Sequence, residues 1–138
     1  MKRLLNTAFI YAIAAMAGGV FYREFTKFSG FSGRTSLAFI HTHLFMLGMF
    51  FFLAAALFQF HAALDQDRRF RIFYWIYNSG IVITTIGFAW RGVVQVRNLD
   101  ISKGMDAAVS GVSGIGHILT GIGLVLFFLI LKKQTANK

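Results

Sequence analysis

Four long apolar stretches, separated by short polar segments, set the pattern of this chain. They cover about residues 4–22, 37–60, 70–94 and 107–131. Each is long enough to cross the hydrocarbon core of a bilayer as a helix, which takes about 20 residues. The strands of a membrane β-barrel would be shorter and would alternate polar and apolar side chains. The pattern therefore predicts an all-α membrane protein, with one domain of four transmembrane helices.

The polar segments predict how the chain turns between these helices. The first runs from Arg23 to Arg34 and keeps three phenylalanines, so we expect it to lie along the membrane interface. A charged turn at residues 65–69 and a polar connection at 97–106 follow. Four spans place both termini on one side of the membrane. The termini and the central turn carry more Lys and Arg than the other two loops, so we expect that side to be the cytoplasm, at a bacterial inner membrane.

Composition narrows the chemistry that such a bundle can hold. The chain is 57% hydrophobic and 14% charged, and it has no cysteine, which excludes disulfides, thiolate metal sites and iron–sulfur clusters. All five acidic residues lie between the apolar stretches, so the spans hold no paired carboxylates of the kind that proton-coupled carriers use. The net charge of +9 predicts contact with anionic lipids rather than nucleic acid. No catalytic constellation is visible, and the sequence does not predict an enzyme.

The second apolar stretch contains two histidines, His41 and His43. Polar, titratable side chains at this depth are costly and rare. Two residues that are two positions apart on a helix diverge by about 200° around its axis. We therefore expect His41 and His43 to face different neighbours and not to bind one metal ion from the same helix.

A third histidine, His117, lies among glycines in the fourth stretch. Helical spacing places Ser113, Gly114 and Gly121 on the same face as His117. Two glycines beside an imidazole leave bare backbone, the space that a flat macrocycle needs. The alternative is close helix packing through small residues, and the two interpretations are compatible.

Together these residues predict a binding site for haem b. Neutral imidazole is a preferred axial ligand of haem iron, and helix bundles hold cofactors with side chains from facing helices. The candidate iron ligands are His41, His43 and His117. Arg23 and Arg91 lie at the ends of spans, where they can pair with the haem propionates, although arginines also reach the interface without any such partner.

Two other functions remain open at this point. In a membrane scaffold or small transporter subunit, the histidines would be interhelical hydrogen-bond partners and nothing more. In a channel or carrier for protons or metal ions, they would titrate near neutral pH.

The whole chain resembles an uncharacterised family of small four-helix bacterial membrane proteins. The segment from Tyr22 to Phe52 is also similar to the catalytic subunit of haem-copper oxidases. It carries Tyr22-Arg23-Glu24, then a glycine-bearing loop, then a helix with His41-Thr42-His43 followed by Met46 and Gly48. In that family an Arg-x-Glu motif precedes a haem-ligand helix, and a His-x-His helix serves two adjacent haems.

This resemblance implies an assembly. The oxidase subunit has three arcs of four helices, so the chain looks like one arc and a homotrimer would rebuild the ring. Each haem would then lie between neighbouring second helices, with His41 of one chain and His43 of the next as ligands. The copper-site histidines of the oxidases have no counterpart here, so the resemblance implies electron transfer or the sensing of small ligands and not oxygen reduction.

Overall fold

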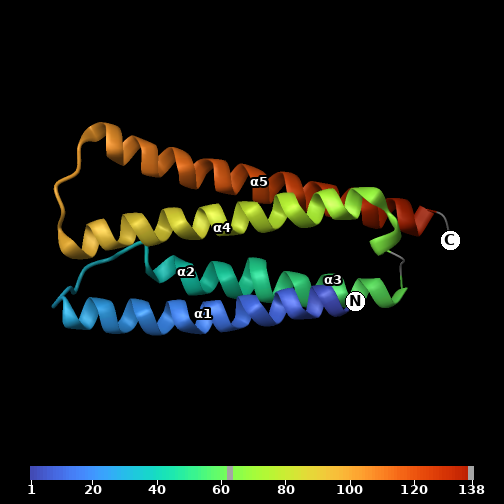
Figure 1. The fold of residues 1–138 in the computed structure, drawn as a ribbon, viewed down its shortest axis with the longest axis horizontal. Coiled ribbons are helices and arrows are strands. Elements are labelled where there is room, and N and C mark those ends of the chain that lie inside the picture. Colours follow the sequence, from blue (N-terminus) through green and yellow to red (C-terminus); the bar gives the residue numbers. More distant parts are fainter. Residues whose placement is uncertain (62–63, 137–138) are drawn as a thin grey trace.

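The computed structural model describes residues 1–61 and 64–136, and all of its regular structure within these ranges is helical (Figure 1). The elements in chain order are α1 (Lys2–Phe28), α2 (Ala38–His43), the π-helical segment η1 (Leu44–Phe50), α3 (Phe51–His61), the 3-10 turn η2 (Leu64–Gln66), α4 (Arg68–Arg97) and α5 (Lys103–Ala136). Because α2, η1 and α3 follow one another without a break, they form a single rod. Four helices are long and apolar enough to cross a membrane, namely Lys2–Phe28, Ala38–Phe60, Arg68–Arg97 and Lys103–Gln134. The prediction of an all-α chain with four such helices is confirmed.

The four rods lie side by side with their long axes roughly aligned, in the order α5, α4, α2–α3 and α1 (Figure 1). The chain runs in opposite directions in successive rods. The rod α2–α3 packs against α1 on one side and against α4 on the other. Helix α5 packs along α4. Helix α1 begins at the end of the bundle where α5 finishes, as an even number of spans requires (Figure 1).

The helices extend beyond the apolar stretches that predicted them. The expectation that a loop begins at Arg23 is wrong, because α1 continues to Phe28. Helix α5 likewise begins at Lys103, before its apolar stretch. Arginine, glutamate and lysine are good helix formers, so a helix continues through them into the headgroup region. Hydropathy marks the part of a helix that lies in lipid, and it does not mark where the helix ends.

Small residues set the close contact between α4 and α5. A Cβ atom added to Gly80 would lie 2.5 Å from the backbone nitrogen of Thr120, and one added to Gly123 would lie 2.8 Å from Cβ of Tyr77. Gly87 faces Ser113 in the same way. Helices in lipid associate through such small residues because the hydrophobic effect gives them little reason to pack. Some of the glycines of α5 therefore serve helix packing.

The π-helical segment η1 begins directly after His43. A change between α-helical and π-helical register leaves backbone groups without their usual partner, and in lipid each such group needs another one. The Tyr77 hydroxyl of α4 donates to the Leu47 carbonyl of this segment at 3.0 Å. Gly48 lies directly against the ring of Tyr11, where any side chain would clash. This segment had no signal in the hydropathy pattern.

Side-chain hydrogen bonds join α1 to α4 inside the apolar region. Thr7 Oγ1 and the Tyr74 hydroxyl lie 2.7 Å apart, and the Tyr11 hydroxyl donates to Asn78 Oδ1 at 2.7 Å. The guanidinium of Arg3 lies over the Tyr74 ring at 4.4 Å from its centre. These contacts hold the outer helix α1 in register with the centre of the bundle.

Candidate functional site

Two of the predicted histidines lie side by side in one chain. The ring centres of His43 on α2 and His117 on α5 are 6.1 Å apart, and their planes are nearly perpendicular at 87°. Phe88 of α4 contacts both rings, with centre-to-centre distances of 4.8 Å to His43 and 5.8 Å to His117. Three helices therefore contribute to one cluster of rings, which we call the His43–His117 cluster.

The hydrogen bonds of these two imidazoles fix the same proton position in each. His43 Nδ1 lies 2.9 Å from the Phe39 carbonyl oxygen, and His117 Nδ1 lies 2.8 Å from the Ser113 carbonyl oxygen. A carbonyl oxygen only accepts, so each Nδ1 carries the hydrogen in the neutral ring. The lone pair then lies on Nε2, which has no hydrogen-bond partner within residues 1–61 and 64–136. This tautomer, with Nδ1–H bound to a backbone carbonyl, is the usual form of a metal-binding histidine.

The α5 surface beside His117 is open. A Cβ atom added to any of three glycines would meet no atom within 4 Å, and these are Gly111, Gly114 and Gly121. The imidazole of His117 is itself exposed. Gly116 and Gly123 lie on the opposite side of the helix against α4, and Ser113 packs there too rather than on the open face. The glycines of α5 thus divide between one face that packs on α4 and another that nothing in the chain covers.

His41 faces away from this cluster. Its ring is stacked on Tyr22 of α1, with centres 6.5 Å apart and planes at 11°, and Gly19 packs against its Cβ. Its Nδ1 atom is buried and has no hydrogen-bond partner among the residues that the structure describes. The prediction that His41 and His43 face different neighbours is confirmed. Within one chain the structure brings His43 to His117 and not to His41.

The two predicted arginines have different settings. Arg91 Nη2 donates to Asp106 Oδ1 at 2.9 Å and to Ser110 Oγ at 2.6 Å, and so ties α4 to α5. Arg91 follows Phe88 by three residues, about one helical turn beyond the His43–His117 cluster. Arg23 at the end of α1 is 79% exposed and pairs with Glu24 at 3.7 Å. Arg91 is therefore the arginine that shares helices with the cluster.

The remaining side chains limit what the cluster can bind. Within the described ranges, no group of three or more His, Cys, Asp or Glu side chains lies together in a way that could hold a metal ion. Phe88 is the member of the cluster that sequence reasoning missed, because a phenylalanine in a chain with 17 of them carries no signal.

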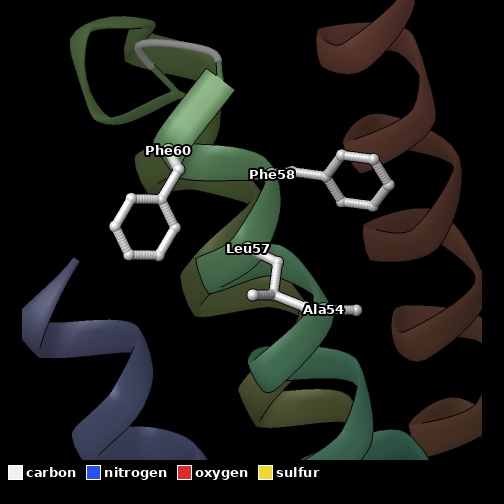
Figure 2. Close-up of a pocket in the computed structure, with 4 residues that line it drawn as sticks. All are labelled: Ala54, Leu57, Phe58 and Phe60. Atoms are coloured by element: carbon white, nitrogen blue, oxygen red, sulfur yellow. The ribbon is translucent and has the colours of Figure 1, made fainter.

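The α3 surface has an apolar hollow of about 650 Å³ (Figure 2). Its lining residues are Ala54, Leu57, Phe58 and Phe60. These side chains carry no polar atom, so the hollow can make apolar contacts with lipid but has no side-chain group that could bind a metal or catalyse a reaction.

A model of a protein family, described as "Protein of unknown function (DUF2871)", matches residues 1–134. The chain belongs to this family. It agrees with the resemblance drawn from the sequence to an uncharacterised family that covers the whole chain. No curated protein and no solved structure matches the chain. The similarity of this DUF2871 member to haem-copper oxidases accordingly stays a hypothesis based on its short His-x-His segment.

Proposed function

We propose that this protein binds b-type haem in the membrane, with His43 and His117 as the two axial ligands of the iron. One observation carries the proposal. The ring centres of two imidazoles from different helices lie 6.1 Å apart within the apolar spans, and neither Nε2 has a hydrogen-bond partner in the described part of the chain. Polar groups placed there without a partner are costly, so a ligand that uses both is the economical explanation.

The spacing of the rings suits a shared iron. Two imidazoles bound through Nε2 on opposite sides of one iron at about 2 Å would have ring centres roughly 6 Å apart. The distance of 6.1 Å between His43 and His117 matches this value. The resemblance to haem-copper oxidases implies a different pairing, with His41 of one chain and His43 of the next as ligands. Single histidine variants distinguish that pairing from the one proposed.

The number of ligands favours haem over a bare metal ion. Zinc takes four ligands, and the described residues near the cluster supply two imidazoles and no third ligand. Haem iron takes four nitrogens from its own macrocycle, so two imidazoles complete its coordination. The open face of α5 at Gly114 and Gly121 leaves bare backbone beside His117, and a haem held by both imidazoles would displace Phe88, whose ring contacts both of them.

Arg91 gives the site a positive group at a suitable depth. It contacts Ser110, which lies seven residues before His117 and thus about 10 Å away along α5. Arg91 is one-third exposed and pairs with the carboxylate of Asp106, so a propionate would share or replace that partner. We assign Arg91 to a haem propionate, and we leave the highly exposed Arg23 as the weaker candidate for the same role.

The role that follows is electron transfer. When bound, haem supplies the reversible one-electron chemistry of its iron, and two protein ligands leave no free position for a substrate. If one histidine dissociates, the same site senses small ligands. The wider proposal places the protein in a bacterial inner membrane as a homotrimer, with cytoplasmic termini and anionic lipids around it. Large exposed apolar side chains on all the rods support the membrane setting, among them Phe9, Ile13, Leu57, Trp75 and Ile118.

An absorption spectrum tests the proposal. Protein purified in detergent from haem-supplied cells should be coloured and should show a sharp α band after reduction with dithionite. A colourless preparation from such cells overturns it.

The second candidate is a membrane scaffold or transporter subunit with histidines as interhelical hydrogen-bond partners. It predicts no chromophore. The Nδ1 atoms of His43 and His117 each bond to a carbonyl of their own helix. In the described ranges, neither histidine makes a hydrogen bond to a neighbouring helix. This observation favours the haem proposal over the scaffold.

A further inference from the structure

A second pocket, of about 430 Å³, lies where the end of α1, the following loop and the end of α4 meet. Its volume is within the range of small-ligand sites, about 300 to 1,000 Å³. Its lining includes Tyr22, Arg34, Ser36, Phe39 and Gln95. It adjoins the His43–His117 cluster through Phe39, whose carbonyl oxygen lies 2.9 Å from His43 Nδ1, but its polar groups belong to other residues and need no haem.

The pocket is lined by hydrogen-bond donors. Ser36 is only 9% exposed, and its hydroxyl makes no hydrogen bond within the described part of the chain although it lines the pocket. The Ser36 backbone N–H donates to Gln95 Oε1 at 2.7 Å. This bond fixes the orientation of the Gln95 amide and leaves its NH₂ group free to donate to a ligand.

Arg34 gives the pocket its charge. Within residues 1–61 and 64–136, Arg34 has no carboxylate partner, whereas Arg23 pairs with Glu24 and Arg91 pairs with Asp106. No acidic residue lines the pocket. A guanidinium, a hydroxyl and an amide NH₂, without any carboxylate, form a site for an anion with several acceptor oxygens.

The position of the pocket indicates which anion this is. It lies at the ends of α1 and α4, where membrane-spanning helices reach the headgroup region. Phe39 is 53% exposed and Tyr22 forms another wall, so apolar surface continues from the donors towards the spans. We propose that this pocket binds the phosphate of an anionic phospholipid, with Arg34 and Ser36 on the phosphate oxygens and the acyl chains along Phe39.

The test measures phospholipid that stays with the protein through purification. Full-length protein in neutral detergent is incubated with phosphatidylglycerol or with phosphatidylcholine, passed through gel filtration, and analysed by native mass spectrometry. We expect the protein to keep one phosphatidylglycerol per chain and no phosphatidylcholine, and Arg34→Gln to lose that lipid. The matched control is Arg23→Gln, which removes the same charge from an arginine that does not line the pocket, and it should keep the lipid.

Four results would overturn the proposal. These are equal retention of the two lipids, no retention of either, equal losses in Arg34→Gln and Arg23→Gln, or displacement of the lipid by millimolar inorganic phosphate, which would make the site one for the free anion. Ser36→Ala is a second variant that removes the hydroxyl with little change in volume. It should weaken retention while the thermal midpoint stays unchanged. Haem content should be the same in Arg34→Gln and Ser36→Ala, two residues with no role in the proposed haem site, so the result is independent of the proposed function.

Discussion

The imidazoles of His43 and His117 come together from α2 and α5, two helices that are not neighbours in the order of the rods. Helix α4 lies between these rods and contributes Phe88, whose ring contacts both histidines. A contact of this kind needs long ring side chains that reach past the intervening helix. The packing of α4 against α5 thus positions His117 beside His43. The glycines between α4 and α5 affect the site indirectly, because they set how closely the two helices pack.

The two faces of α5 should respond differently to substitution. Gly116→Leu should destabilise the protein by about 1 to 3 kcal/mol, because a side chain there overlaps Thr84 of α4. Gly114→Leu should leave the thermal midpoint unchanged, since nothing lies within 4 Å of that position, but should lower the haem content by filling the open face. Thermal unfolding in detergent and the ratio of haem to protein check the pair. Full haem content in Gly114→Leu would show that the open face is not part of the site.

Arg91→Gln should reduce haem retention with little effect on stability. The pair of Arg91 with Asp106 is partly exposed, and pairs of this kind contribute about 0 to 1 kcal/mol. The expected loss of haem comes from the missing charge opposite a propionate. Dialysis against a haem acceptor measures retention relative to the parent protein, and Arg23→Gln tests the weaker candidate in the same way. Retention in Arg91→Gln equal to that of the parent protein would remove Arg91 from the proposed site.

Tyr77→Phe should destabilise the bundle by about 0.5 to 1.5 kcal/mol, because the Leu47 carbonyl in the π-helical segment loses the hydrogen bond from the Tyr77 hydroxyl. Tyr22→Phe is the control, since the Tyr22 hydroxyl makes no hydrogen bond in the described part of the chain. Unfolding in a series of denaturant concentrations separates the two. Equal midpoints would mean that the Leu47 carbonyl finds another partner.

The turn between α3 and α4 should make stability depend on pH in the acid range. Asp67 caps α4 by accepting from the Arg69 backbone N–H at 2.9 Å, and its carboxylate also pairs with the Arg69 and Lys133 side chains at 3.0 and 3.7 Å. The hydrogen bonds from Arg69 lower the pKa of Asp67 from 3.8 to about 2. A lowered pKa in the folded state means that the stabilisation is complete above the unfolded value, near pH 4, and is lost as the pH falls towards 2.

Two variants separate the contributions of Asp67. Asp67→Ala loses both the cap and the charge, and should cost about 1 kcal/mol at neutral pH. Asp67→Asn keeps a capping oxygen, so it should cost less and should remove the part of the acid dependence that Asp67 causes. Thermal midpoints measured between pH 2 and pH 7 check both. An unchanged acid profile in Asp67→Asn would exclude Asp67 as its source.

Local pattern was enough to predict the helices and the divergence of the two adjacent histidines. Hydropathy locates a span wherever about 20 apolar residues follow one another, and the angle between His41 and His43 follows from helix geometry alone. The end of α1 at Phe28 was missed because a helix continues into the headgroups while the apolar pattern stops. The π-helical segment was missed because it depends on Tyr77 of another helix.

The local sequence pattern could not predict which two histidines pair in the candidate site. The sequence indicated each of His41, His43 and His117, but which two lie together depends on how α2, α4 and α5 pack. The sequence allowed two compatible roles for the α5 glycines, namely helix packing and space beside His117. Only the packing of α4 showed that Gly116 and Gly123 belong to the interface and that Gly114 and Gly121 belong to the open face.

The most direct test of the central claim is the reduced absorption spectrum of three single variants, purified in parallel with the parent protein. With His43 and His117 as the iron ligands of one chain, His43→Ala and His117→Ala each lose the sharp α band, and His41→Ala keeps it. Loss of the band in His41→Ala together with its retention in His117→Ala would contradict the pairing and favour ligands from neighbouring chains. Absence of the band from the parent protein itself would contradict haem binding altogether.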